Sequence, residues 1–126
     1  KSKDAKKVLI GSFLNLSSVV KYLLFGENSV LIVCAGWKGK VNLEDTLFAG
    51  AVVEKLKNHI EPDCDAPLAA QHLYNQAKNN MVQFLSTSSH VRRLNRLNIH
   101  KDIEFCLTCD QYNVVPRLTQ GILKLV

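Results

Sequence analysis

The stretch between residues 36 and 45 places glycines, lysines and acids directly after an apolar run. Gly36, Lys38 and Gly39 would bring backbone N–H groups and a cation close to a bound anion. Glu44 and Asp45 follow in the predicted first turn of a helix, where carboxylates offset unpaired N–H groups and the helix dipole. The same carboxylates would suit a hard divalent cation such as Mg²⁺ at a phosphoryl site. The spacing alone leaves the structural and the functional interpretation of these acids open.

A second group of polar residues lies between residues 86 and 93, where four hydroxyl residues precede His90, Arg92 and Arg93. Guanidinium groups bind phosphate or sulfonate oxygens in a fork, and hydroxyl residues at a helix start also favour an anion. A solvated basic helix face would give the same pattern. The residues alone do not choose between these interpretations.

The cysteines give a weaker signal. Cys106 and Cys109 have a spacing found in zinc sites, but no second pair or nearby histidine completes one in the sequence. We therefore expect a strand end with buried thiols there, and Cys34 is expected to be a core residue at the end of another strand. Four cysteines without the density of a disulfide-stapled domain favour a reducing cytoplasm.

Apolar patterning predicts the elements that position these residues. Residues 8–13 and 29–35 are continuous apolar runs, which are typical of strands buried on both faces, and residues 17–24 between them have helical spacing. A strand, helix, strand unit predicts parallel neighbours with a right-handed crossover. The further expectations are a helix over 43–60, a second from about 66 to 84, a short basic helix ending at Leu97, a strand over 103–107 and an extended segment at 114–116.

These elements predict an α/β fold, with three layers in the order α/β/α and a partly parallel or mixed sheet. The 126 residues, of which 47% are hydrophobic, suit one domain or half-domain over 1–126. No apolar run reaches the roughly 20 residues of a membrane span, so we expect a soluble protein without a membrane partner.

The net charge of +5 does not indicate a nucleic-acid partner. Four of the positive charges are lysines within the first seven residues, at positions 1, 3, 6 and 7. A second cluster consists of Arg92, Arg93 and Arg96. Aromatic residues are sparse and do not alternate with lysine or arginine, as they do on single-strand stacking surfaces. A small anionic ligand fits the charge pattern better.

Ordered blocks along nearly the whole chain resemble the 2-phosphosulfolactate phosphatase family. They are residues 8–15, 34–36, 42–45 with 49–50, 89–90 with 92–94, 102–103, Asp110 and 115–116. The resemblance implies a Mg²⁺-dependent phosphatase that removes phosphate from 2-phospho-3-sulfolactate, a step toward coenzyme M, or from a similar small phosphorylated or sulfonated acid. It implies Glu44 or Asp45 as metal ligand, and Asn15, Gly36, Lys38, Gly39, Arg92 and Arg93 as substrate-binding residues.

The resemblance also implies that the chain is the C-terminal portion of a longer phosphatase. The family's N-terminal half carries an Asp-Val-Leu-Arg-Ala-Thr type segment and an Asn-Gly-Thr turn, which these residues lack. An acid in that half would serve as metal ligand or nucleophile, so the catalytic residues of this chain are not identified. Val91 stands where the family often has glycine, and Asn42 where it usually has serine.

Two functions therefore remain as hypotheses: a phosphatase fragment, and a noncatalytic anion-binding or assembly module with the same fold. In either case we expect an exposed apolar sheet edge or face, covered by the missing N-terminal half or by another copy of the chain. We also expect Asn15, Gly36, Lys38, Glu44 and Asp45 to converge at the carboxyl ends of two neighbouring strands.

Overall fold

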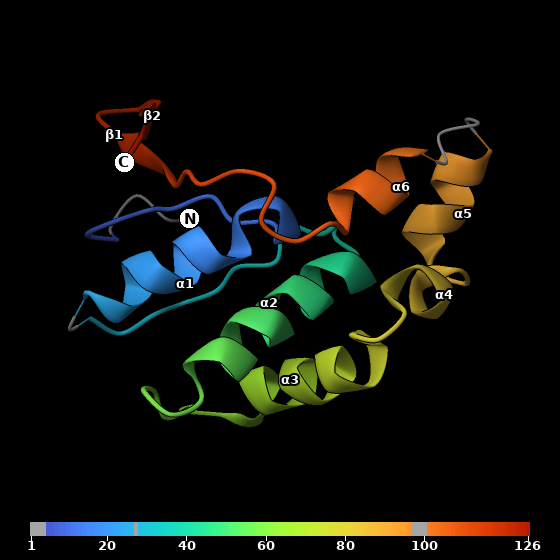
Figure 1. Cartoon of the computed structure of the whole chain (residues 1–126), viewed down its shortest axis with the longest axis horizontal. Helices are drawn as coiled ribbons and strands as arrows, with labels where there is room; N and C mark the ends of the chain where they lie inside the picture. Colours follow the sequence, from blue (N-terminus) through green and yellow to red (C-terminus); the bar gives the residue numbers. More distant parts are fainter. Residues whose placement is uncertain (1–4, 27, 97–100) are drawn as a thin grey trace.

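The computed structural model describes residues 5–26, 28–96 and 101–126, and it shows an α/β chain in which helices predominate (Figure 1). The elements in order are the 3-10 turn η1 (Phe13–Asn15), α1 (Leu16–Leu24), α2 (Leu43–Leu56), α3 (Asp65–Ala77), α4 (Met81–Leu85), α5 (Ser89–Asn95), α6 (Lys101–Cys106), β1 (Pro116–Thr119) and β2 (Ile122–Leu125). The β1–β2 hairpin lies at one end of the molecule and α4 to α6 at the other.

Helix α1 confirms the helix predicted between the two apolar runs. Leu16, Val19 and Val20 are buried on one side of it, at the spacing expected of an amphipathic helix. Its first turn is held by the loop before β1, because Asp110 accepts hydrogen bonds from both the N–H and the hydroxyl of Ser17. A carboxylate at this position also complements the helix dipole.

Helices α2 and α3 pack closely against each other. Gly50 makes this possible, since a Cβ atom there would clash with the carbonyl group of Ala70. Gly50 is therefore the point of closest approach of the two helices. Asn42 precedes α2, and its carbonyl accepts from the N–H and the hydroxyl of Thr46. The helix ends at Leu56, four residues before the predicted Ile60.

The single helix predicted from about 66 to 84 is divided into α3 and α4. The division falls at Asn80, whose side chain accepts a 3.1 Å hydrogen bond from the N–H of Gln83 and so starts a new helix. Ser88 starts α5 in the same way, through a 3.1 Å bond from the N–H of Val91. The predicted end of this basic helix, Leu97, lies outside the described residues.

The strand predicted over 103–107 is wrong, because most of this segment is helix α6. The N–H of Leu107 bonds to the carbonyl of Ile103 at 3.2 Å, and these two residues turn toward the core. A short apolar run fits a strand and a helix equally well when it is read alone. The thiols of Cys106 and Cys109 are exposed rather than buried, and so is Cys34.

The predicted parallel pairing of residues 8–13 with 29–35 is not found in the described part of the chain. Instead, residues 8–10 lie antiparallel to β1: Ile10 N–H donates to Pro116 at 2.9 Å, and Leu118 N–H donates to Val8 at 2.9 Å. Within 5–26, 28–96 and 101–126, the only ladder between named strands is the antiparallel hairpin of β1 and β2. Residues 114–116 continue into β1, as the predicted extended segment requires.

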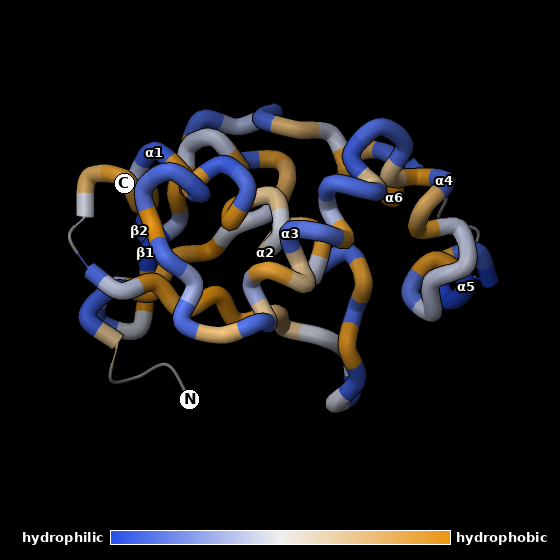
Figure 2. Tube along the Cα trace, turned by 90° about the horizontal axis from the view of Figure 1, so that it is seen from below, coloured by the Kyte–Doolittle hydropathy of each residue, from blue (hydrophilic) through white to orange (hydrophobic). Residues whose placement is uncertain are grey.

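The core lies among the helices. The most deeply buried large side chains are Leu16, Leu47, Val52, Leu56 and Leu85. Each contributes about 1.5 to 3 kcal/mol by leaving water. Figure 2 shows further apolar stretches along the chain outside the helices. Val30, Leu31 and Val33 are exposed, as expected of an uncovered apolar surface, but this segment is not a strand in the described chain, so the predicted sheet edge or face is not shown. No helix among the described residues has the length and apolarity required to cross a membrane.

Candidate functional site

The turn at residues 36–40 is a tight reversal that only small or permissive residues can form. Trp37 and Lys40 exchange two backbone hydrogen bonds, at 2.9 and 3.0 Å. Gly36, Lys38 and Gly39 all have positive φ angles, of 65°, 50° and 74°. At Gly36 a side chain would meet the carbonyl of Lys40, so glycine is required there.

Asp45 anchors this turn to helix α2. Its Oδ2 atom accepts a 2.7 Å hydrogen bond from the N–H of Gly36. Although Cys34 is an exposed residue, partial desolvation by its neighbours raises the pKa of its thiol, and the negative charge of Asp45 raises it further. Cys34 is therefore a poor nucleophile in this environment, because thiolate rather than thiol is the reactive form.

Glu44 points toward helix α5. Its Oε1 lies 3.2 Å from Nδ1 of His90, and the same Nδ1 lies 2.6 Å from a guanidinium nitrogen of Arg93. The Oε2 atom of Glu44 is buried without a hydrogen-bond partner among the described residues. A buried carboxylate oxygen without a donor is costly, so it marks a place where a cation or a donor would stabilise the fold.

Trp37 connects the turn to α5. The guanidinium group of Arg93 stacks over the Trp37 ring, 4.2 Å from its centroid, and the Lys38 ammonium lies 5.9 Å from the same centroid. Stacking of this kind contributes about 0.5 to 2 kcal/mol and holds the guanidinium plane in one orientation. The Arg93 guanidinium group therefore lies over the Trp37 ring, with one of its nitrogens 2.6 Å from His90 Nδ1.

The structure thus brings together four of the eight predicted site residues. Gly36, Asp45, Glu44 and Arg93 are connected through direct contacts that also involve Trp37 and His90. We call these six residues the turn–α5 cluster. The other predicted residues of this region, Lys38, Gly39 and Arg92, are exposed beside it.

Asn15 has different contacts. Its buried side chain accepts from Ser12 N–H at 2.8 Å and donates to the carbonyls of Ile10 and Val114 at 3.2 and 3.0 Å. These bonds join the first apolar run to the segment before β1. They do not connect Asn15 with the turn–α5 cluster, and its role in binding substrate stays a prediction.

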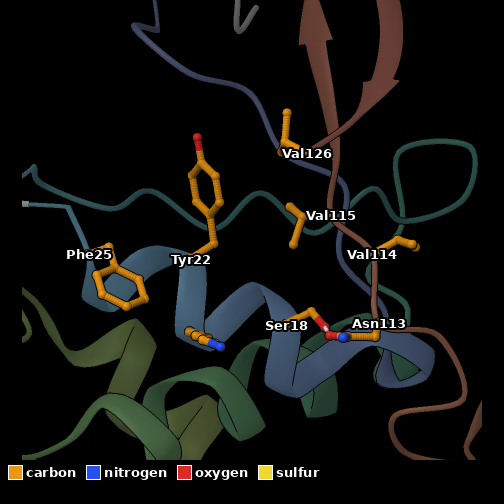
Figure 3. A pocket seen from close by; sticks show the side chains of 8 residues that line it. Ser18, Tyr22, Phe25, Asn113, Val114, Val115 and Val126 are labelled. Carbon is orange, nitrogen blue, oxygen red and sulfur yellow. Dashed lines mark hydrogen bonds between the residues drawn. The ribbon is translucent and has the colours of Figure 1, made fainter.

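Two open pockets lie elsewhere. One, of about 230 Å³, lies between α1 and the C-terminal segment and is lined by Tyr22, Phe25, Val115 and Val126 among others (Figure 3). The Ser18 hydroxyl and the Asn113 side chain hydrogen bond at its base. The other, of about 350 Å³, is lined by Lys6, Lys7 and residues 117–120. Neither pocket includes a predicted site residue.

The donor set for a metal is incomplete. No group of three or more histidine, cysteine, aspartate or glutamate side chains that would hold a metal ion is present in the part of the chain that the structure describes. Glu44 nevertheless fits a cation, because its buried Oε2 lacks a donor. Mg²⁺ usually takes only one or two carboxylates and fills its other positions with water and phosphate oxygens.

Two members of the cluster were not predicted as site residues. His90 was grouped with the arginines by sequence but not connected to Glu44, and Trp37 was not assigned any role. The spacing of His90 and Arg93, three residues apart on a helix, predicts their mutual contact. No local pattern connects residues 37 and 44 to α5, since that contact depends on how the helices pack.

The fold and cluster define an α/β domain that gathers basic and acidic side chains beside a glycine-containing turn. A family model described as 2-phosphosulpholactate phosphatase matches residues 1–121, so the chain belongs to the 2-phosphosulpholactate phosphatase family, whose activity is phosphoric monoester hydrolysis.

Curated relatives agree with this assignment. A protein of Caldanaerobacter subterraneus subsp. tengcongensis named probable 2-phosphosulfolactate phosphatase is 40% identical over 96% of this chain and 51% of its own length. Relatives with the same name in Thermotoga petrophila and Trichormus variabilis are 41% and 36% identical, and the matches cover 52% and 53% of their lengths. The chain therefore spans about half the length of these relatives.

Proposed function

We propose that this chain contributes the turn–α5 cluster to a phosphatase that hydrolyses 2-phospho-3-sulfolactate, or a similar small phosphorylated acid, to sulfolactate and phosphate. The observation that supports this most is the convergence of Arg93, Glu44 and the 36–40 turn in a member of the family. Such a substrate carries phosphate, carboxylate and sulfonate charges, which require cations and N–H donors.

In this proposal the cations bind the anionic groups of the substrate. Arg93 is held with its guanidinium plane fixed, which suits two parallel hydrogen bonds to phosphate or sulfonate oxygens. Lys38 and Arg92 are exposed beside it and add positive charge. The backbone of Gly36 and Gly39, together with Asn15, completes the proposed set of binding groups.

We propose Glu44 rather than Asp45 as the principal Mg²⁺ ligand of this chain. Asp45 already uses an oxygen to hold Gly36, whereas Glu44 has a buried oxygen to which no described residue donates. When bound, Mg²⁺ neutralises charge on the transferring phosphoryl group. Residues from outside this chain would supply the nucleophile and further ligands.

We further propose that the complete protein is a three-layer α/β/α fold, in which this chain is the C-terminal portion and residues 8–13 and 29–35 belong to a partly parallel or mixed sheet. The match to about half of each relative supports a missing half as partner. Four free cysteines agree with a cytoplasmic protein, and the family name agrees with a role in coenzyme M biosynthesis.

The alternative is a noncatalytic anion-binding or assembly module. The incomplete metal donor set in the described residues favours it for the chain alone. An assay of phosphate release by this chain joined to the unmatched half of a relative, with and without Mg²⁺, separates the two. Mg²⁺-dependent release supports the phosphatase, and phosphate binding without turnover supports the module.

A further inference from the structure

Residues 29–35 form an apolar segment that the rest of the described chain leaves largely uncovered. Leu31 and Val33 are 87% and 73% exposed, and Val30 is 41% exposed. The segment contains no charged residue. Isolated apolar side chains on a surface are ordinary, but a continuous exposed run of this kind marks an interaction surface.

The backbone of this segment is also unpaired. Among the described residues, no backbone N–H or C=O group from residue 29 to residue 35 takes part in a hydrogen bond. Residues 8–10 differ, since they are paired on one edge with β1. An apolar stretch of β-branched and aliphatic residues with free backbone donors and acceptors is suited to pairing with another strand.

One side chain of the segment, that of Ile32, contacts the core. Ile32 is half-buried and packs against the cluster of buried residues formed by the helices. Leu31 and Val33 flank it in sequence, and neighbouring side chains of an extended chain point to opposite faces. Ile32 is thus the one residue of the segment that the helices partly cover, and Leu31, Val33 and the backbone edges are open.

We propose that residues 29–35 are a docking strand for the half of the family's fold that this chain does not match, and that a β-strand of that half pairs with it while an apolar layer covers Leu31 and Val33. This inference rests on the assembly of two halves in the proposed function, but not on phosphatase activity. The partner is recognised by main-chain hydrogen bonds and by pockets for alternate side chains, as in strand addition.

The complementary half fits this surface better than a second copy does. The relatives are about twice as long as their match to this chain, so a region of similar size belongs to the same fold. A second copy related by a twofold axis would place one strand on one edge of the segment. A continuous apolar run is typical of a strand covered on both faces, and a region of similar size can supply both a pairing strand and the covering layer.

The docking strand leads directly into the turn–α5 cluster. Ala35 is its last residue, and Gly36, the next, is held by Asp45. A partner paired with this strand would therefore lie at the carboxyl end where the cluster is located, and ligands in open α/β sheets bind at such ends. Docking would bring residues of the other half to the site that needs them.

The test mixes this chain with the unmatched half of the Thermotoga petrophila relative, which is 41% identical over the shared region. Light scattering measures the mass of the mixture, and hydrogen exchange measures protection of individual amides. We expect a one-to-one complex in which exchange at residues 30–35 slows at least tenfold. Leu31→Asp should abolish the complex, and Val33→Pro, which removes an N–H that has no partner in the described chain, should weaken it at least tenfold.

Leu68→Asp is the matched control, because Leu68 is an exposed leucine, 40% accessible, on α3. It should leave the complex unchanged. Absence of a complex, a complex that tolerates Leu31→Asp, or protection of residues 30–35 through dimers of this chain alone would each overturn the inference. A complex that forms as described but does not release phosphate would count against the proposed function and leave the docking strand intact.

Discussion

At the scale of single residues, the central observation is that Arg93 has little freedom. Its guanidinium group stacks on Trp37 and contacts Nδ1 of His90, so its orientation is set before a ligand binds. Arg92, the adjacent residue, is exposed. Since preorganised groups lose less entropy on binding, the two arginines should differ in their contribution to anion affinity.

Arg93→Gln should therefore weaken binding of inorganic phosphate more than Arg92→Gln does. A hydrogen bond to a charged group contributes about 1.5 to 3 kcal/mol, so we expect roughly a tenfold or greater loss for Arg93. Trp37 is the only tryptophan, and its fluorescence reports the titration directly. Equal losses of phosphate affinity in both variants would show that the contact of Arg93 with Trp37 does not contribute to anion binding.

At the scale of elements, the contact of α2 with α3 determines stability, and Gly50 is its closest point. Gly50→Ala should destabilise the fold by about 1 to 3 kcal/mol or more, because the added methyl group meets the backbone of α3. Gly26→Ala is the control, since its Cβ would lie 3.5 Å from the nearest atom, the Leu23 carbonyl. Urea denaturation compares the two, and equal midpoints would contradict the close packing.

Glu54 connects the same two helices and makes their contact dependent on pH. It accepts hydrogen bonds from Lys57, and from Gln71 and Asn75 of α3, and these bonds lower its pKa from 4.5 to about 2. Because the folded pKa lies below the unfolded one, the stabilisation is present above about pH 4.5 and is lost as the pH falls toward 2.

Glu54→Gln should accordingly lower the thermal midpoint near neutral pH, and the difference from the unmodified chain should shrink between pH 4.5 and 2. Thermal unfolding followed by circular dichroism across this range measures it. Glu61→Gln removes an exposed acid and serves as the control. A difference that is constant with pH would mean that the carboxylate of Glu54 is not held by these bonds.

The helices were the elements that sequence predicted best. Helical spacing located α2, and the four hydroxyl residues before His90 marked the start of α5, because both signals act over a few neighbouring residues. The segment at 103–107 was wrong because a short apolar run carries no period of its own. The parallel pairing of 8–13 with 29–35 was not found, since a strand is defined by partners that lie elsewhere in the chain or outside it.

For the candidate site, the sequence predicted individual residues but not their contacts with one another. Glu44, Asp45 and the 36–40 turn stood out by residue type, and the arginines of α5 by their charge. Their convergence through Trp37 and His90 could not be predicted from local patterns, because it depends on the packing of α5 against the start of α2.

At the scale of the whole molecule, the exposed apolar segment at residues 29–35 agrees with the proposal that this chain is part of a larger assembly. The claim that most needs testing is that Glu44 holds the cation of a working phosphatase. The structural reason for that claim is its Oε2 atom, which is buried and has no hydrogen-bond partner in the described part of the chain.

The direct measurement is Mg²⁺-dependent release of phosphate from 2-phospho-3-sulfolactate by this chain joined to the unmatched half of a relative, with Mn²⁺ affinity measured in parallel by electron paramagnetic resonance. We predict that Glu44→Gln lowers turnover by about two orders of magnitude, as loss of a transition-state charge partner does, and weakens Mn²⁺ binding while the thermal midpoint is kept. Full Mg²⁺-dependent turnover and unchanged Mn²⁺ affinity in Glu44→Gln would contradict the assignment and leave Glu44 as a residue of the helix start.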